Sequence, residues 1–315
     1  MTKRIFLLFL IFALTISPAY AKEDYIRWVD FQVGYEALKA AMDTDIRSHE
    51  TERPVSWICL LALASARSGG GKLSAKDVQR AEKLLLGDQS LEKLLGKQYS
   101  TYEYYKEAYG AILDGLLGSY AIYIHGQWVP QYGLKAFSPI AAGYGYSHYE
   151  DFGSRRSYGF VRRHLGNDLM GTLGTPIVAV EGGTVEAMGW NRYGGWRIGI
   201  RSHDKKRYYY YAHLQKDHPF PPELKVGDTI QAGDVIGFMG RTGYSDKENV
   251  NNIDAIHLHF GIQLIFDESQ KECDNEIWID PYSIVRLLSS HRSSLQKSDG
   301  RWERMYPYKD LDRAA

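Results

Sequence analysis

A run of eleven residues, 253–263, contains two histidines, His257 and His259, that alternate with the apolar residues Ile256, Leu258 and Phe260. Successive side chains of a β-strand point to opposite faces of its sheet, so this run predicts a strand whose two imidazoles face the same side. The intervening apolar residues then face the other side. Imidazole binds zinc and also acts as a general base near neutral pH. The pair can therefore hold a metal ion and work on its water, or can simply be two polar residues of a half-exposed strand.

A second group of metal-ligand side chains lies upstream, where His164 is followed by Asp168. This spacing can bring an imidazole and a carboxylate to one cation on a helical turn or in a loop, and Gly166 and Gly171 favour a loop. Catalytic zinc usually has three protein ligands and one position open to water. His164, Asp168 and one histidine of the later pair would supply those ligands. A fourth histidine, His213, follows a run of tyrosines and is a further candidate.

The order of these motifs is similar to that of a known family. The motifs His-xxx-Asp, Tyr-Ala-His-Leu and His-Leu-His-Phe are separated by Gly-Thr-Pro-Ile-Val-Ala-Val, Gly-Gly-Thr-Val and Val-Gly-Asp-Thr-Ile-Gln-Ala-Gly-Asp. Residues 158–288 thereby resemble the lysostaphin-type (LytM-like) zinc metallopeptidases, which cut peptide links in bacterial peptidoglycan. The resemblance implies one zinc ion per chain, held in a groove of an antiparallel β domain of the duplicated hybrid motif type.

The resemblance also implies a role for each site residue. His164, Asp168 and His259 would bind zinc, whereas His257 and His213 would lie beside the metal-bound water as catalytic histidines. The residues alone do not decide which histidine of the 257/259 pair is the ligand. Because the chain has no His-Glu-xx-His motif, a histidine would replace glutamate as the base.

Three features near the motifs bear on the substrate. Residues 244–255 form a longer and more polar approach to the His-x-His strand than is common in the family, so substrate preference stays open. Alternation along the tyrosine run puts Tyr209 and Tyr211 on the face of His213, where they either line the site or pack in the sheet. The arginines around His164 are interpreted as a solvated basic edge; they are Arg155, Arg156, Arg162 and Arg163.

The chain as a whole is predicted to be α+β. Its 315 residues allow about two domains. Residues 22–125 repeat apolar side chains every three or four positions and predict a helical domain, with a capping box at 74–77. Residues 126–290 consist of short strand candidates broken by glycine, which predicts an antiparallel all-β peptidase domain built as two sheets or a partly open barrel. Residues 291–315 are predicted to be a loosely packed polar tail.

The N-terminus and the charge balance indicate where the chain acts. Residues 1–21 contain two basic residues, an apolar run and an Ala-x-Ala end, which predict a secretory signal peptide cleaved after Ala21 or an uncleaved anchor. The protein is therefore expected to be extracytoplasmic, secreted or associated with the cell envelope. Lys plus Arg equals Asp plus Glu at 38 each, which argues against a nucleic-acid partner. Cys59 and Cys273 either pair or remain free thiols.

These observations predict a zinc metalloendopeptidase that hydrolyses peptide cross-links or stem peptides of peptidoglycan. The alternative is a catalytically silent module that binds peptidoglycan or serves as a scaffold in an envelope, division or sporulation complex. The helical domain could bind an envelope protein in either case. Silent relatives typically lack one or more metal or catalytic residues, and this chain has all five. A lipoyl or biotinyl carrier is disfavoured because no lysine lies at a suitable hairpin tip.

Overall fold

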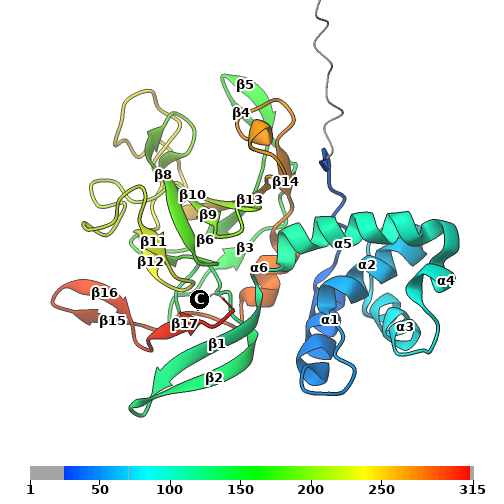
Figure 1. The fold of residues 1–315 in the computed structure, drawn as a ribbon. Helices are drawn as coiled ribbons and strands as arrows, with labels where there is room; N and C mark the ends of the chain where they lie inside the picture. Colours follow the sequence, from blue (N-terminus) through cyan, green and yellow to red (C-terminus); the bar gives the residue numbers. More distant parts are fainter. Residues whose placement is uncertain (1–24, 70, 313–315) are drawn as a thin grey trace, which may run out of the picture.

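A computed structural model describes residues 25–69 and 71–312. Helices occupy the first part of the chain and lie on one side of the molecule, whereas the strands that follow form the other side (Figure 1). The predicted signal peptide, residues 1–21, lies outside the described residues. Within the part of the chain that is described, no helix has both the length and the apolar character needed to cross a membrane.

The helical part is built from amphipathic helices around one almost fully buried helix. That central helix, Trp57–Ser68, carries an unbroken apolar run, and its residues 60–64 are at most 3% exposed. The predicted capping box is confirmed, because Ser74 and Asp77 bond to each other's backbone at the start of the third helix. The helices of this part are α1 (Tyr35–Ser48), α2 (Trp57–Ser68), α3 (Ala75–Leu85), α4 (Leu91–Leu95) and α5 (Tyr99–Leu113).

The rest of the chain is dominated by one eight-stranded sheet in which every neighbouring pair is antiparallel. Its strand order is β11-β8-β9-β10-β13-β6-β3, and β14 also pairs with β13. The predicted antiparallel β part is thus confirmed, whereas the duplicated hybrid motif stays a prediction. The strands are β3 (Ser147–His148), β6 (Asn167–Met170), β8 (Gly183–Asn191), β9 (Gly195–Ser202), β10 (Arg207–Ala212), β11 (Thr229–Ile230), β13 (His257–Leu264) and β14 (Ile277–Ile279).

Smaller sheets surround this one. A hairpin of β4 and β5 rises above it beside β14, and β7 pairs with β12 (Figure 1). Cys59 and Cys273 are both free. The elements are β4 (Arg155–Tyr158), β5 (Phe160–Arg163), β7 (Pro176–Val178), β12 (Val235–Phe238), the helix α6 (Tyr282–Leu288) and the single 3-10 turns η1 (Gly96–Gln98) and η2 (Glu268–Gln270).

Two boundaries differ from those expected. Strands begin at β1 (Leu117–Ile124), which pairs with β2 (Gln127–Leu134). The expected boundary between the helical and β parts, at residue 126, therefore falls in the turn of a hairpin. The C-terminal segment is not a loose tail as far as residue 312, because it forms β15 (Leu295–Ser298), β16 (Arg301–Arg304) and β17 (Tyr308–Asp310). β17 pairs with β1, and Tyr308 is 5% exposed and stacks on Tyr120. A single buried aromatic residue and strand pairing therefore anchor a mostly polar segment.

A buried polar cluster joins the helices to the large sheet. Arg207 on β10 is fully buried and forms a two-point ion pair with Glu181, with N–O distances of 2.8 and 3.1 Å. Its third nitrogen donates to the carbonyl of Ala111 in α5 at 2.7 Å, and the Tyr209 hydroxyl donates to Glu181 at 2.7 Å. Every charged atom of this cluster thus has a partner. Such pairing offsets the free energy that is lost when a charge is moved out of water.

Replacing Arg207 with Met should destabilise the protein by about 3–5 kcal/mol, because it leaves the Glu181 carboxylate buried without its counter-ion. Urea unfolding followed by tryptophan fluorescence measures the change. The matched control is Arg53→Met, whose ion pair with Asp88 is solvent-exposed and should contribute less than about 1 kcal/mol. A double variant, Arg207→Met with Glu181→Leu, should recover much of the loss. Equal, small effects of Arg207→Met and Arg53→Met would contradict this account.

Candidate functional site

The site is built on one face of β13. His257 and His259 both point to the cleft, whereas Leu258 and Phe260 are fully buried on the opposite face, as the alternation predicts. The antiparallel register places His259 directly opposite Asp168 on β6 and opposite Ala212 on β10. Strand pairing alone therefore brings a carboxylate from one part of the chain beside a histidine about 90 residues later.

Three ligand atoms meet at this point. His164 Nε2 lies 2.7 Å from His259 Nδ1 and 3.1 Å from Asp168 Oδ1, and the latter two atoms are 3.4 Å apart. His164 precedes β6 in a turn, and Asp168 belongs to β6. These are the three residues expected to bind zinc, and no further side chain is needed to complete the triangle.

The donor set fits a zinc ion. In a tetrahedron with zinc–ligand bonds of 2.0–2.1 Å, neighbouring ligand atoms lie roughly 3.3 Å apart. Two of the observed separations, 3.1 and 3.4 Å, lie close to this value, and the third, between His164 Nε2 and His259 Nδ1, is shorter at 2.7 Å. Asp168 Oδ1 is also buried and accepts no well-aligned hydrogen bond, although the ring nitrogens of three histidines lie 3.1–3.7 Å from it. A cation bound by the three atoms of the triangle would satisfy this oxygen.

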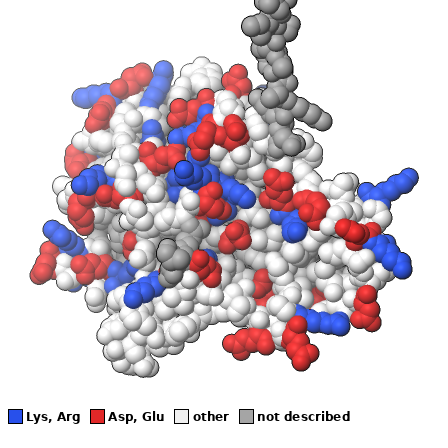
Figure 2. Space-filling model, viewed as in Figure 1, with Lys and Arg blue, Asp and Glu red and all other residues white. Residues whose placement is uncertain are grey.

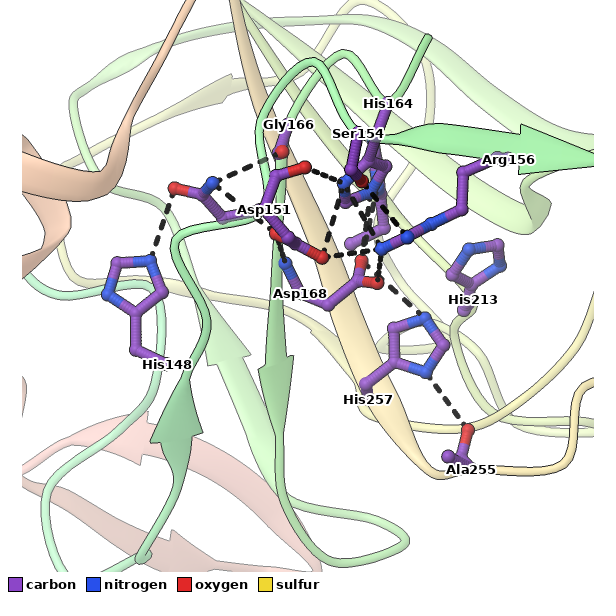
Figure 3. A network of polar contacts seen from close by, with 12 residues as sticks. His148, Asp151, Ser154, Arg156, His164, Gly166, Asp168, His213, Ala255 and His257 are labelled. Carbon is purple, nitrogen blue, oxygen red and sulfur yellow. Dashed lines mark hydrogen bonds and ion pairs between the residues drawn. The ribbon is translucent and has the colours of Figure 1, made fainter. Parts of the chain in front are cut away.

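Residues outside the triangle hold its members in place. Asp151 contacts His164 Nδ1 through both its backbone carbonyl, at 3.2 Å, and its carboxylate, at 3.3 Å. Arg156 extends from β4 between two carboxylates and donates to Asp151 at 2.5 Å and to Asp168 Oδ2 at 3.0 Å (Figure 3). Asp168 is thereby held by one oxygen while the other faces the two histidines. Such outer contacts fix the ring tautomer and raise the basicity of the ligand.

Gly166 allows the turn that carries His164 to cross β13 at close range. A Cβ at this position would lie 2.4 Å from the carbonyl oxygen of Phe260 and 2.9 Å from the His259 ring. Both are closer than atoms can approach without a shift of the backbone, so any side chain here would push the turn away from β13. The glycine is therefore required by the geometry of the ligand triangle.

Two further histidines face the triangle across the cleft. His213 and His257 lie on the opposite side of Asp168 from Asp151 (Figure 3), and their ring centres are 4.8 Å apart. His213 Nδ1 is 2.9 Å from the carbonyl of Thr242, and His257 Nδ1 is 2.9 Å from the carbonyl of Ala255. A carbonyl oxygen only accepts hydrogen bonds, so each Nδ1 carries the proton. The Nε2 atom of each ring is left for other contacts, and that of His257 lies 3.7 Å from Asp168 Oδ1.

Burial and neighbouring charges give the histidines different protonation. Burial, together with the nearby His257 and His259, holds the pKa of His213 well below its ordinary value, so this ring is neutral at neutral pH. Burial also lowers the pKa of the His164 ring, but its contacts with Asp151 and Asp168 outweigh this effect and raise the pKa to about 9. Burial raises the pKa of Asp168, yet its contacts with His164 and His259 hold that pKa far below the usual range. The carboxylate is therefore ionised.

The five residues open into a cleft of about 540 Å³. All residues that line it lie between Arg156 and Trp278, so none comes from the described part of the helical region. Of the two possibilities for Tyr209 and Tyr211, packing in the sheet is confirmed. Both are fully buried on the other face, and Tyr208 and Tyr210 line the cleft instead.

The reason is a break in the strand at His213. This residue has a φ of +63°, in the left-handed region, directly after β10 ends at Ala212. The reversal of the chain turns the His213 side chain into the cleft instead of continuing the alternation of β10. Strand alternation therefore cannot be extended through this position, and no residue in the sequence marks the break.

Two of the four arginines of the β4–β5 hairpin are more than a solvated basic edge. Arg155 and Arg163 are exposed, as expected for a solvated edge. Arg156, in contrast, bridges Asp151 and Asp168, and Arg162 donates to the Tyr244 hydroxyl at 2.8 Å. The contact of Asp151 with His164 could not be predicted from the sequence, because a separation of thirteen residues matches no metal-binding spacing. The predicted contribution of the 244–255 loop to the cleft holds for Tyr244 and Ile253.

Comparison with known proteins places this site in a family. Residues 162–274 match the model of peptidase family M23. The chain carries a peptidase family M23 domain. The matched segment contains all five residues of the ligand triangle and the histidine pair, which the structure brings together around one cleft.

Several named proteins are similar to the M23 domain of this chain. The L-Ala--D-Glu endopeptidase of Bacillus subtilis is 35% identical over 166 residues, which cover 52% of this chain and 47% of that protein. Lysostaphin of Staphylococcus simulans is 39% identical over 98 residues, covering 31% and 17% of the two chains. The chain thus spans less than half the length of these relatives. A lytM structure from Ruminococcus gnavus shares the fold, with a TM-score of 0.53, 24% identity and coverage of 83% and 89%.

Replacing Asp151 with Ala should weaken zinc binding about 10- to 100-fold, because it removes the carboxylate that orients His164 and holds Arg156 against Asp168. Competition titration against a chromophoric chelator measures the affinity. Asp246→Ala, which removes an exposed carboxylate of the 244–255 loop, is the control and should leave zinc binding unchanged. An unaltered zinc affinity in Asp151→Ala would show that the outer contacts do not support the triangle.

Proposed function

We propose that the chain is a zinc-dependent endopeptidase that hydrolyses peptide bonds of bacterial peptidoglycan, acting outside the cytoplasm. The observation that carries this proposal is the buried Asp168 Oδ1 beside two histidine nitrogens, which together form a group that could hold a metal ion in an M23 domain, next to two further histidines that line the same cleft. A zinc ion bound by His164, Asp168 and His259 would lower the pKa of a water molecule and polarise the carbonyl of the scissile bond.

The histidine pair supplies the proton transfers. Both His257 and His213 line the cleft and direct Nδ1 to a backbone carbonyl, so the Nε2 atom of either ring, when neutral, can accept a proton from the attacking water. A ring that has gained this proton becomes a donor at the same nitrogen. It can then return the proton to the leaving amine nitrogen or donate a hydrogen bond to the carbonyl oxygen as that atom gains negative charge. The two carbonyl contacts at Nδ1 keep both rings in the orientation that this exchange requires.

The helical part is proposed to be a separate domain that supports the M23 domain and leaves its cleft open. Arg207 ties α5 to β10, and no described helical residue lines the cleft. A silent wall-binding module is the alternative function, and the presence of a complete set of five site residues gives it no support. The names of the relatives differ in the bond that is cut, since one names L-Ala--D-Glu and another glycyl-glycine. The bond cut by this chain is therefore left to experiment.

Incubation of the protein with purified peptidoglycan should release fragments with new amino and carboxyl ends, and removal of zinc by a chelator should abolish the release. Mass spectrometry of the fragments identifies the bond. Restoring zinc to the chelated protein should restore release, which separates loss of metal from loss of folding. Zinc-loaded protein that binds peptidoglycan but releases nothing would favour the silent module.

The division of roles among the histidines predicts two different losses. His164→Ala should lose zinc and therefore all activity, because it removes a member of the ligand triangle. His257→Ala should retain zinc but lose roughly 10²- to 10⁴-fold in the rate of hydrolysis, the usual contribution of a general acid–base group. Zinc content is measured by elemental analysis and the rate by release of peptide ends. Equal loss of zinc in both variants would contradict the assignment.

A further inference from the structure

The cleft contains hydrogen-bond donors that have no partner and that do not belong to the metal site. Across the described residues, six buried side-chain nitrogen or oxygen atoms have no hydrogen-bond partner, and four of them belong to residues that line this cleft. One is the acceptor Asp168 Oδ1, which the metal site uses. The other three are donors: Arg162 Nη1, Arg197 Nη1 and Gln263 Nε2. Buried donors without acceptors are costly, so their concentration at one cleft indicates a ligand that supplies acceptors.

The sheet register places Arg197 in the same row as the metal ligands. Ile198 pairs with Tyr211, so the preceding residue on β9, Arg197, lies beside Ala212, which in turn pairs with His259. Arg197 is thus two strands from His259, a backbone separation of roughly 10 Å at the usual strand spacing. Ala212 lies between them and lines the same cleft.

Two other cationic groups that line the cleft form ion pairs with acidic residues. Arg156 is bound by Asp151 and Asp168, and Lys271 forms an ion pair with Glu186. Arg162 donates one nitrogen to Tyr244. For Arg197, in contrast, the described residues provide neither an ion pair nor a hydrogen bond to Nη1. Over the visible face of the molecule, charges of both signs are interspersed (Figure 2), so a general attraction to anions does not explain an unpaired arginine inside a cleft.

The surroundings of Arg197 suit a peptide. The next row of the floor contains Gly199 and Gly261 on either side of Tyr210, and the row beyond contains Gln263 between Tyr208 and Trp278. A Cβ at Gly261 would lie 2.8 Å from the Trp278 ring, so this ring lies over the glycine. Gln263 is only 3% exposed, and its unpartnered amide donor lines the cleft. Aromatic walls, an amide donor and one free guanidinium are the features of a site for an extended peptide with an anionic group.

We infer that Arg197 is a specificity residue that binds a free carboxylate of the substrate close to the scissile bond, so the enzyme acts on acidic peptides in preference to neutral ones. The inference rests on the proposed function, because the cleft must hold a peptide next to the metal site. Arginine and carboxylate form charge-assisted, often two-point, hydrogen bonds, which an amide in place of the carboxylate cannot reproduce. Glutamyl residues with a free α-carboxylate are substrates of this class, whereas glycyl-glycine links are not.

The test uses two synthetic stem peptides that differ at one group: a glutamyl α-carboxylate beside the candidate bond is free in one and amidated in the other. Full-length protein is assayed with zinc for cleavage, and after chelation for binding by calorimetry. Wild-type protein should bind and cleave the carboxylate peptide better, by roughly 10- to 100-fold. Arg197→Gln should lose this preference, with KM for the carboxylate peptide raised and the amidated peptide unaffected.

Two controls keep the result interpretable. Arg192→Gln removes an exposed arginine of the same β8–β9 hairpin that does not line the cleft, and it should retain the preference. Arg197→Lys keeps the charge without the forked geometry, so its preference for the carboxylate peptide should be weaker than that of wild type and stronger than that of Arg197→Gln. This variant also provides a test if the glutamine variant does not fold. Equal binding of both peptides by wild-type protein, or an equal loss for both in Arg197→Gln, would overturn the inference. Selective binding without cleavage would uphold it and overturn the proposed function instead.

Discussion

The site depends on the register between β6 and β13. Backbone hydrogen bonds place His259 opposite Asp168, and the same pairing continues through Ala212. A shift of one residue would turn His257 and His259 into the core and bring Leu258 and Phe260 into the cleft. The full burial of those two apolar residues opposes such a shift. Hydrophobic burial on one face of β13 thus fixes the position of the metal ligands on the other.

The role proposed for each histidine follows from the hydrogen bond that one ring nitrogen makes, because this bond decides where the other nitrogen points. His164 is oriented from outside by Asp151, and its Nε2 faces His259 and Asp168. His213 and His257 donate Nδ1 to backbone carbonyls, and His257 Nε2 lies 3.7 Å from Asp168 Oδ1. In the proposed mechanism, these four histidines divide into two that would hold a cation and two that would exchange protons. The β4–β5 hairpin completes the arrangement, because Arg156 occupies the outer oxygen of Asp168 and leaves the inner one for the metal.

Much of this could be predicted from the sequence, for identifiable reasons. The period of two along residues 253–263 placed His257 and His259 on one face, and the capping box located the start of α3. The positive φ of His213 could not be predicted, so the tyrosines that line the cleft were assigned to the wrong face. The outer contacts of Asp151 and Arg156 join positions without a local pattern, and they become visible only when a hairpin folds over β6. These contacts depend on the tertiary fold and not on the spacing of residues along the sequence.

The central claim is that one cation lies among His164, Asp168 and His259 and not between His213 and His257. Anomalous diffraction at the zinc absorption edge, from crystals of the protein grown with zinc, tests it most directly. The account predicts one strong peak at roughly 2.0–2.2 Å from His164 Nε2, Asp168 Oδ1 and His259 Nδ1. A peak bonded to His213 or His257 in place of one of these ligands would contradict it.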